Sequence, residues 1–501
     1  MKNTKSSGYD EISPFLIKKC YLSLINPLCC LINKSFLLGK FPDLLKLTIV
    51  KPIYKKGDPK QVKNYRPIAL LSTFSKIIEK VVYNRLISYL QENSLLNPLQ
   101  FGFRPSKNIN DAIFNFVSNI ADAIDGSHYT LGLFCDLSKA FDCVNHNLLL
   151  QKLKYYGIQG SAFKWLNSYL LNRKQKVIIS KKDFANYETV INGVPQGSVL
   201  GPLFFLIYIN DLKNSLNYSQ LILFADDTTL LLNHPDPHIL KDQISQDLNS
   251  VISWLNANGL SLNKEKTNLI QFKSNYSKIS SHNELKIINN GLLNGINVST
   301  EVQYLGLKIE NSMNWKTHVN YLAKKVNKAH YVLFVLSKLT NLQTLKTVYY
   351  AYVYSHISYG IIFWGNSTYS KIIFKAQKKI IRTIGRVRRN SSCKPIFAQL
   401  QILPLPCVYI FKLICFVKIN YNLFNSNHLN HNYSTRNRNC LIYPNHNSTF
   451  FQKSPLYMGK KLYNKLPDFI KNKFVLSDFK KELKNYLMNN LFYSINDYLN
   501  K

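Results

Sequence analysis

Acidic side chains are scarce in this sequence of 501 residues. It has 27 aspartates and glutamates against 64 lysines and arginines, which gives a formal net charge of +37 at pH 7. A cation excess of this size attracts polyanions. A proteome from an AT-rich genome is also rich in lysine, asparagine, isoleucine and tyrosine, so part of the charge has a plainer origin. Nucleic acid is still the partner class that the charge favours.

Paired cysteines and long apolar runs are also missing. None of the nine cysteines lies in a CxxC pair, and there is no Cys/His zinc knuckle, which indicates reduced, intracellular thiols. The start MKNTKSSGYD is polar, unlike a signal peptide, and runs such as LFFLIYI at 203–209 are too short to span a bilayer. The sequence therefore predicts an intracellular protein without a membrane partner, and nucleus and cytoplasm stay equally open.

Apolar periodicity predicts an α+β fold, with strands and helices alternating from residue 129 to 227. The expected helices are 75–90, 146–156, 161–171, a segment starting after Pro202, a segment around 244–255 that ends at Gly259, and most of the chain beyond 315. The expected strands are 130–135, a pair at 176–180 and 187–191, a hairpin over 221–232, and 267–272. Helices covering one face of the sheet would resemble a ferredoxin-like core.

Carboxylates lie at two strand ends of this pattern. Asp226 and Asp227 form the turn of the hairpin LILFADDTTLLL, and Asp136 closes the strand TLGLFC. Two adjacent aspartates repel each other unless a cation lies between them, and Mg²⁺ prefers one or two carboxylates together with substrate phosphates. Each motif alone has a common structural explanation, namely a solvated acidic turn or an aspartate that caps a helix. Together they favour a phosphoryl-transfer site.

The segments around these carboxylates resemble the reverse transcriptase of non-LTR retrotransposons, most closely the jockey-like elements. The resemblance covers residues 1 to about 310 and continues more weakly to the end. It rests on NYRPIALLSTFSKIIEK at 64–80, LLNPLQFGFRPSKN at 95–108, FCDLSKAFD, NGVPQGSVLGPLFFLIYINDL at 192–212, FADD, SLNKEKTNLIQF at 261–272 and YLGLKI at 304–309. It implies an RNA-directed DNA polymerase whose partners are an RNA template, a DNA primer and deoxynucleoside triphosphates. Protein partners stay unknown.

For the chemistry, the resemblance implies two Mg²⁺ ions, with Mn²⁺ as an alternative, held by Asp136 and Asp226 with Asp227 in support. Lys266 falls where the family has a lysine that protonates the departing pyrophosphate.

For the nucleotide, the resemblance implies that Phe141 excludes a ribose 2′-hydroxyl and that Gln196 and Gly197 lie against the nucleotide and templating base. Arg66 would contact the triphosphate, with Lys51 as a helper. Outside this context, Phe141 would be a core aromatic at a helix start, and the cations would be solvated surface residues.

The resemblance also implies the architecture of a right-hand polymerase. Residues 1–310 would form the reverse transcriptase domain, with fingers over 1–128 and mainly the ferredoxin-like palm over 129–310, including a primer-grip hairpin. A helical thumb would follow over 311–370. Residues 371–501 would form a basic, mostly helical region of unknown role.

Two further interpretations stay open. The segment KSSGYDEISPFLIKK at 5–19 already resembles the opening of the polymerase region, so we expect no N-terminal endonuclease. The chain could be a catalytically silent nucleic-acid-binding remnant of such an element, although Asp136, Asp226 and Phe141 are all present. It could also be a reverse transcriptase like those of group II intron maturases, which FADD and NGVPQGSVLGPLFF disfavour.

Overall fold

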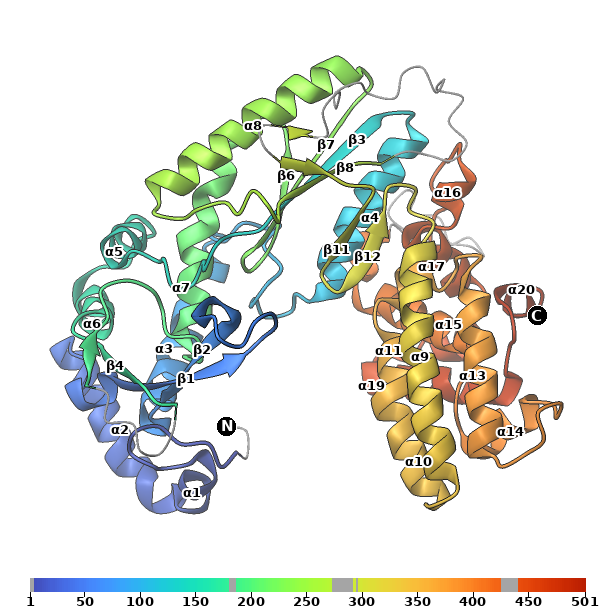
Figure 1. Cartoon of the computed structure of the whole chain (residues 1–501), viewed down its shortest axis with the longest axis horizontal. Helices are drawn as coiled ribbons and strands as arrows, with labels where there is room; N and C mark the ends of the chain where they lie inside the picture. The colour runs from blue at the N-terminus through green and yellow to red at the C-terminus, as the bar shows by residue number, and fades with distance from the viewer. Residues whose placement is uncertain (1–3, 180–185, 273–291, 294–295, 425–439) are drawn as a thin grey trace.

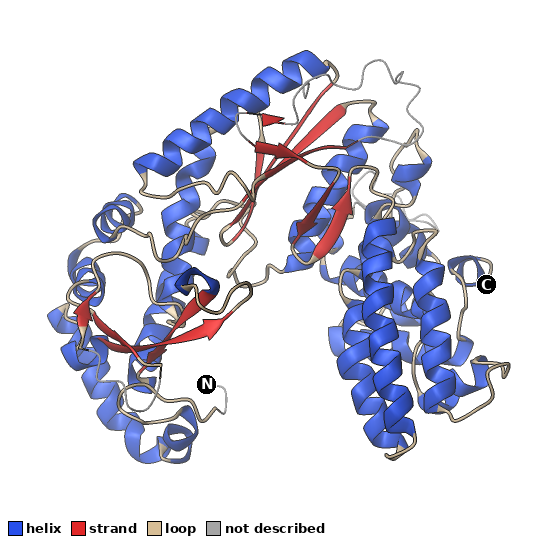
Figure 2. Cartoon of the chain, in the orientation of Figure 1, coloured by secondary structure: helices blue, strands red, loops and turns tan. Residues whose placement is uncertain are grey.

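The computed structural model describes residues 4–179, 186–272, 292–293, 296–424 and 440–501. The chain has a central sheet from which an N-terminal and a C-terminal part, here called limbs, project on the same side (Figure 1). The N-terminal limb combines a small sheet with helices, whereas the C-terminal limb is helical after a short hairpin (Figure 2). The two limbs face each other below the central sheet.

The N-terminal limb is built on a four-stranded sheet with the order β2-β1-β4-β5. Its strands are β1 (Leu47–Tyr54), β2 (Tyr65–Leu71), β4 (Lys174–Val177) and β5 (Glu188–Thr189). The helices of this limb and of its junction with the central sheet are α1 (Pro14–Lys19), α2 (Tyr21–Leu38), α3 (Thr73–Glu92), α5 (His146–Tyr155) and α6 (Gly160–Leu170). The predicted pair of strands is present as β4 and β5, which are shorter than expected; residue 180 lies outside the described residues.

Helix α2 is both apolar and largely exposed. Its 18 residues have a mean hydropathy of 1.3, and only 11% of them are buried. By length and composition α2 could cross a membrane, as could α14 (Lys394–Leu400) and α15 (Leu405–Ile419) together if that bent pair were one span. The expectation that no apolar segment is long enough is therefore wrong for α2. Core helices and signal sequences have the same properties, so a membrane location does not follow.

The central sheet has six strands in the order β6-β7-β3-β8-β10-β9. They are β3 (Tyr129–Cys135), β6 (Gln220–Phe224), β7 (Asp227–His234), β8 (Asn268–Phe272), β9 (Leu292–Leu293) and β10 (Ile296–Val298). Strand β3 pairs antiparallel with both β7 and β8, so it lies in the middle of the sheet. This position brings its carboxyl end beside the β6–β7 turn.

Helices cover both faces of the central sheet, not one as expected. Alternate side chains of the strands, such as Leu131 and Leu133, pack with α7 (Leu200–Ile209) and α8 (Pro237–Ala257) in one hydrophobic core. Phe134 points the other way and packs with α4 (Ile109–Asp125) in a second core. Helix α4 can cover this second face because its apolar residues, which include Phe116 and Ile120, form a wide stripe along one side of the helix and are buried there.

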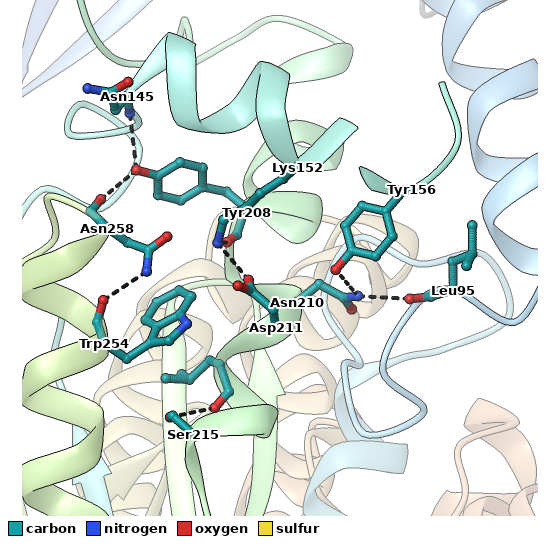
Figure 3. A network of polar contacts seen from close by, with 11 residues as sticks. Leu95, Asn145, Lys152, Tyr156, Tyr208, Asn210, Asp211, Ser215, Trp254 and Asn258 are labelled. Atoms are coloured by element: carbon teal, nitrogen blue, oxygen red, sulfur yellow. Dashed lines mark hydrogen bonds and ion pairs between the residues drawn. The ribbon is translucent and has the colours of Figure 1, made fainter. Parts of the chain in front are cut away.

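Helix α7 is buried over most of its length. It begins at Leu200, ahead of Pro202 and not after it as predicted, because proline is tolerated in the first turn of a helix. At its far end, Lys152 Nζ donates to the Tyr208 carbonyl at 2.7 Å and to Asp211 Oδ1 at 2.6 Å (Figure 3). Burial lowers the pKa of Lys152, and its contact with Asp211 opposes that shift. This network fixes α7 against α5 and α8.

The C-terminal limb begins with a hairpin of β11 (Glu301–Tyr304) and β12 (Leu307–Glu310) and continues as helices. These are α9 (Lys316–Ser337), α10 (Leu342–Tyr349), α11 (Ser355–Ser358), α12 (Ile361–Trp364), α13 (Ser370–Ile384), α14 (Lys394–Leu400), α15 (Leu405–Ile419), α16 (Thr449–Gln452), α17 (Pro455–Asn464), α18 (Asp468–Lys471), α19 (Leu476–Asn490) and α20 (Ile495–Leu499). They share one hydrophobic core with α4. The predicted helical character beyond residue 315 is confirmed.

Candidate active site

The turn between β6 and β7 carries two of the predicted carboxylates at its tip. Ala225 and Asp226 form this two-residue turn, and Asp227 begins β7. Ala225 has a φ of +57°, which is uncommon for a residue other than glycine. Such backbone strain persists only where the surroundings enforce it, and it is concentrated at functional sites.

The extended segment before α4 enforces this turn. Phe101 N donates to the Leu223 carbonyl at 2.8 Å, and the buried Gln100 side chain accepts from Ala225 N at 3.2 Å. Gly102 lies so close that a Cβ there would be 2.3 Å from Ala225 N. The LLNPLQFGFRPSKN segment therefore acts as a backbone clamp on the carboxylate turn, a role that its loop-like sequence did not reveal.

Asp136 lies beside the turn because of the strand register. Cys135 on β3 pairs with Thr228 on β7 in antiparallel register. The next residue after Cys135 and the residue before Thr228, which are Asp136 and Asp227, are therefore neighbours at the ends of these two strands. The Asp136 carbonyl accepts from Asn263 N at 2.8 Å, within the SLNKEKT segment. The three carboxylates thus share one end of the central sheet.

The pKa values of Asp226 and Asp227 are both raised, in part by their acidic neighbours. Burial, followed by repulsion from Asp226 and Asp136, raises the pKa of Asp227 to about 6. Burial also raises the pKa of Asp226, with Asp136 adding to the shift and Lys55 and Arg66 opposing it. A cation among these carboxylates would relieve the repulsion.

Lys266 reaches the same site from the segment before β8. Its Nζ lies 3.4 Å from Asp136 Oδ2, with 62% and 44% of the two side chains exposed. An ion pair this exposed contributes little to stability. Lys266 is therefore free to exchange Asp136 for another anionic partner.

Phe141, Gln196 and Gly197 come together on the side toward the N-terminal limb. Phe141 stacks on Phe205 of α7, with ring centroids 4.7 Å apart, and its carbonyl accepts from Val194 N. Gln196 Nε2 donates to Asp142 Oδ1 at 3.0 Å.

The loop that carries Gln196 is also tied to β2. The Gln196 carbonyl accepts from Ala69 N at 2.8 Å. Gly197 has a φ of +133°, and a Cβ there would lie 2.6 Å from the Ala69 carbonyl oxygen. Only glycine fits this approach, which keeps the loop against the strand that carries Arg66.

The two cations predicted on the N-terminal sheet differ in their surroundings. The positive charge of Arg66 on β2 opposes the rise in the pKa of Asp226. Lys51 is exposed on β1, where it pairs with Ile68, and it is not among the cations that shift Asp226. Lys55, at the end of the same strand, has that influence instead. Both lysines belong to the run KPIYKKGD and both are exposed, so periodicity could not distinguish them.

Glu79 is a residue that sequence reasoning missed. It lies on α3 with its side chain fully buried, and Oε2 accepts from Val199 N at 2.7 Å and Leu200 N at 3.3 Å. Ser75 Oγ donates to Oε1 at 2.8 Å. A buried carboxylate at the N-terminus of α7 is stabilised by the backbone N–H groups and the helix dipole. Glu79 thereby anchors the helix that follows the Gln196 loop.

Among the described residues, no group of three or more histidine, cysteine, aspartate or glutamate side chains forms a cage that could hold a metal ion. Magnesium in phosphoryl-transfer sites takes one or two carboxylates plus waters and phosphates, so such a cage is not required. The pKa values of Asp226 and Asp227 are raised first by burial and then by repulsion from the neighbouring aspartates.

Residues 53–309 match the family model of reverse transcriptase (RNA-dependent DNA polymerase). The chain belongs to the reverse transcriptase family. Reverse transcriptases generally use divalent metal ions. Its fold is that of a right-hand polymerase, with an N-terminal limb, a central sheet and a helical limb in the order of fingers, palm and thumb.

Curated relatives come from non-LTR retrotransposons. The probable RNA-directed DNA polymerase from transposon BS of Drosophila melanogaster is 28% identical over 74% of this chain and 41% of its own length. That from transposon X-element of the same species is 29% identical over 76% of this chain and 42% of its own length. Apo telomerase from Candida tropicalis has a TM-score of 0.42 at 13% identity, over 80% of this chain and 71% of that chain. The chain thus spans about two fifths of these curated relatives.

Proposed function

We propose that the chain is the RNA-directed DNA polymerase part of a non-LTR retrotransposon protein, acting inside the cell. It adds deoxynucleotides to a DNA primer on an RNA template. The observation that carries this proposal is the cluster of Asp136, Asp226 and Asp227 at one end of the central sheet, facing Lys266 and within reach of the charge of Arg66. Family membership and the names of the relatives support it.

In this proposal Asp136 and Asp226, with Asp227 in support, would hold two Mg²⁺ ions together with substrate phosphates, and the bound ions would supply charge neutralisation and activation of the primer 3′-hydroxyl. Arg66 neutralises phosphate charge from the N-terminal side. Lys266 leaves Asp136 and donates a proton toward the departing pyrophosphate.

The remaining residues select and align the nucleotide. The Phe141 ring, held by its stack on Phe205, fills the space that a ribose 2′-hydroxyl would need. Gln196 and Gly197 lie against the nucleotide and the templating base. Lys51 adds positive charge along β1. The protein therefore works mainly by positioning and charge neutralisation.

The test is Mg²⁺-dependent incorporation of deoxynucleotides on a primed RNA template by purified protein. The double variant Asp226→Asn, Asp227→Asn should lose extension by at least about a hundred-fold, because two ligands of the metal site are gone. Asp242→Asn, which removes an exposed carboxylate of α8, is the matched control and should extend normally.

A folded, RNA-binding wild-type protein that extends no primer would refute the proposal. A catalytically silent nucleic-acid-binding remnant would then describe the chain.

A further inference from the structure

A basic surface lies in the C-terminal limb, away from the carboxylates. Between Asn311 and Pro467 the sequence has no aspartate or glutamate, although lysines and arginines are frequent there. A region charged with one sign over such a length produces a strong positive potential, and a concave surface focuses it. The structure contains such a concave surface between α9 and α13.

This concave surface, here called the thumb groove, has a volume of about 630 Å³. Its cations are Lys338 at the end of α9, Lys379 and Arg382 on α13, and Arg386 and Arg389 beyond that helix. Among the described residues, none of these five cations forms an ion pair with a carboxylate. Their charge is therefore available to a ligand.

The groove is a preformed structure and not a set of free side chains. Arg382 Nε donates to the Ser391 carbonyl at 2.8 Å, and an Arg386 guanidinium nitrogen donates to the Thr340 carbonyl at 2.7 Å. Each guanidinium keeps further N–H donors for a ligand. On the groove wall His330 Nε2 lies 3.0 Å from Thr383 Oγ1, and burial together with Lys379 lowers the pKa of His330. His330 is thus neutral, and the arginines and lysines supply the charge.

One aromatic ring is exposed in this wall. Phe334 has 48% of its surface exposed, and Lys338 Nζ lies 5.0 Å from its ring centroid. An exposed ring beside several cations is the combination that binds single-stranded nucleic acid, in which unpaired bases stack on aromatics while cations hold the phosphates. A duplex hides its bases in the stack and could use the cations but not Phe334.

The groove is separate from the carboxylate site. Helix α9 begins next to the β11–β12 hairpin, and from Lys316 to His330 its axis advances about 21 Å. Helix α13 lies on the side of α9 that faces away from the N-terminal limb (Figure 1). A strand bound in the thumb groove would therefore lie outside the space between the two limbs.

We propose that the thumb groove binds a single-stranded polynucleotide, with phosphates on its lysines and arginines and an unpaired base on Phe334. The site is additional to the proposed polymerase site and does not require catalysis. RNA and DNA single strands share this chemistry, so the experiment compares them.

The experiment measures binding of short fluorescent oligo(U) and oligo(dT) to the full chain by anisotropy. A saturating, unlabelled RNA–DNA hybrid duplex is present to occupy the space between the limbs. The groove variant is Lys338→Glu, Lys379→Glu, Arg389→Glu, which spares the arginines that hold backbone carbonyls. The matched control, Lys453→Glu, Lys465→Glu, Lys473→Glu, makes the same charge change at exposed positions elsewhere in the C-terminal limb.

We expect the groove variant to bind oligo(U) at least about ten-fold more weakly at 0.1 M salt and to lower the slope of log K against log salt by about 2. Phe334→Ala should weaken single-strand binding by about five-fold or more and leave duplex binding unchanged. The control variant should bind as the wild type does. Tighter binding of oligo(U) than of oligo(dT) would identify RNA as the ligand, and equal binding would show that only backbone and base are recognised.

The proposal is overturned if the groove and control variants lose affinity equally, or if Phe334→Ala binds the single strand as tightly as the wild type does. Primer extension on a short primed template, measured with the same proteins, separates this proposal from the polymerase proposal. Groove-dependent binding without extension would refute only the polymerase activity. Extension without groove-dependent binding would refute only the thumb groove.

Discussion

At the scale of single residues, the carboxylate site stores electrostatic repulsion that a metal ion would relieve. The folded protein raises the pKa of Asp227 to about 6, chiefly through burial. A carboxyl group with a raised pKa favours the folded state at low pH, and this contribution is lost as the pH rises from its unfolded pKa through about 6. The metal-free protein should therefore become less stable over this range.

Asp227→Asn removes the repulsion and should stabilise the metal-free protein at pH 7. Because part of Asp227 is exposed to solvent, screening limits the expected gain to about 1 kcal/mol. Thermal unfolding in a chelator at about pH 4 and about pH 7 measures it, and the difference from wild type should nearly vanish at the lower pH. Added Mg²⁺ should stabilise the wild type more than the variant. A difference in stability between variant and wild type that is the same at both values of pH would contradict this account.

Glu79 is expected to act as a positioning residue for the nucleotide. Its carboxylate accepts two backbone N–H groups at the start of α7, directly after the Gln196 loop. In Glu79→Gln the negative charge that the two N–H groups contact is lost, which costs about 1–2 kcal/mol of folding stability because hydrogen bonds to a charged acceptor are stronger than those to an amide oxygen. The loop should shift, raising KM for the deoxynucleotide about ten-fold with a smaller change in kcat.

Steady-state kinetics with a fixed primed template check this prediction. Glu92→Gln, at the exposed end of the same helix, is the matched control and should change neither constant. A lower apparent kcat with an unchanged KM, in proportion to the fraction of unfolded protein, would mean that Glu79 is only structural.

At the scale of secondary-structure elements, the segment before α4 holds the carboxylate turn through backbone contacts. Gly102→Ala would place a Cβ 2.3 Å from Ala225 N, a contact that requires the backbone to move. We expect a destabilisation of more than about 2 kcal/mol and loss of most extension activity. Urea unfolding and primer extension measure the two effects.

Gly126→Ala is the control for the Gly102 substitution. Gly126 caps α4 at a φ of −79°, and the nearest atom to its added Cβ would be 3.5 Å away. This change should be nearly neutral. If Gly102→Ala proved as well tolerated, the segment would not clamp the turn.

At the scale of the whole molecule, the last 130 or so residues share the core of the helices that precede them. The Phe114 ring on α4 lies 5.0 Å from the Phe416 ring on α15, and the Asp125 carboxylate accepts from Ser448 N at 2.7 Å. The boundary at residues 370 and 371, between the thumb and the C-terminal region, stays a prediction. The hydrophobic core nevertheless runs across that position.

Removal of residues 371–501 should therefore unfold the rest of the C-terminal limb. Helix α9 would lose α13, its main packing partner. The free-energy cost of exposing the apolar surface between them would exceed the small net stability of a domain, which is only a few kcal/mol. Hydrogen exchange should show α9 and α10 unprotected in the truncated chain. The strands β3 and β7, which belong to a different core on their α8 side, should keep their protection and are the internal control. Protected α9 amides would contradict the shared core.

Local sequence patterns determined the elements and the chemistry of this protein. Apolar periodicity located α3, β3, α8 and the β6–β7 hairpin, because the spacing of buried residues depends on helix or strand geometry alone. Motif order along the chain identified Asp136, Asp226 and Asp227 as one candidate site, and their roles stay a proposal.

Only the tertiary structure decided how these pieces act on one another. Contacts between segments far apart in sequence, such as Gln100 with Ala225 and Glu79 with Val199, involve single polar atoms that leave no periodic signal. Likewise, only the tertiary structure shows that Lys55, and not Lys51, is among the cations that lower the pKa of Asp226. The thumb groove exists only because α9 and α13 pack side by side and concentrate cations that are dispersed along the sequence.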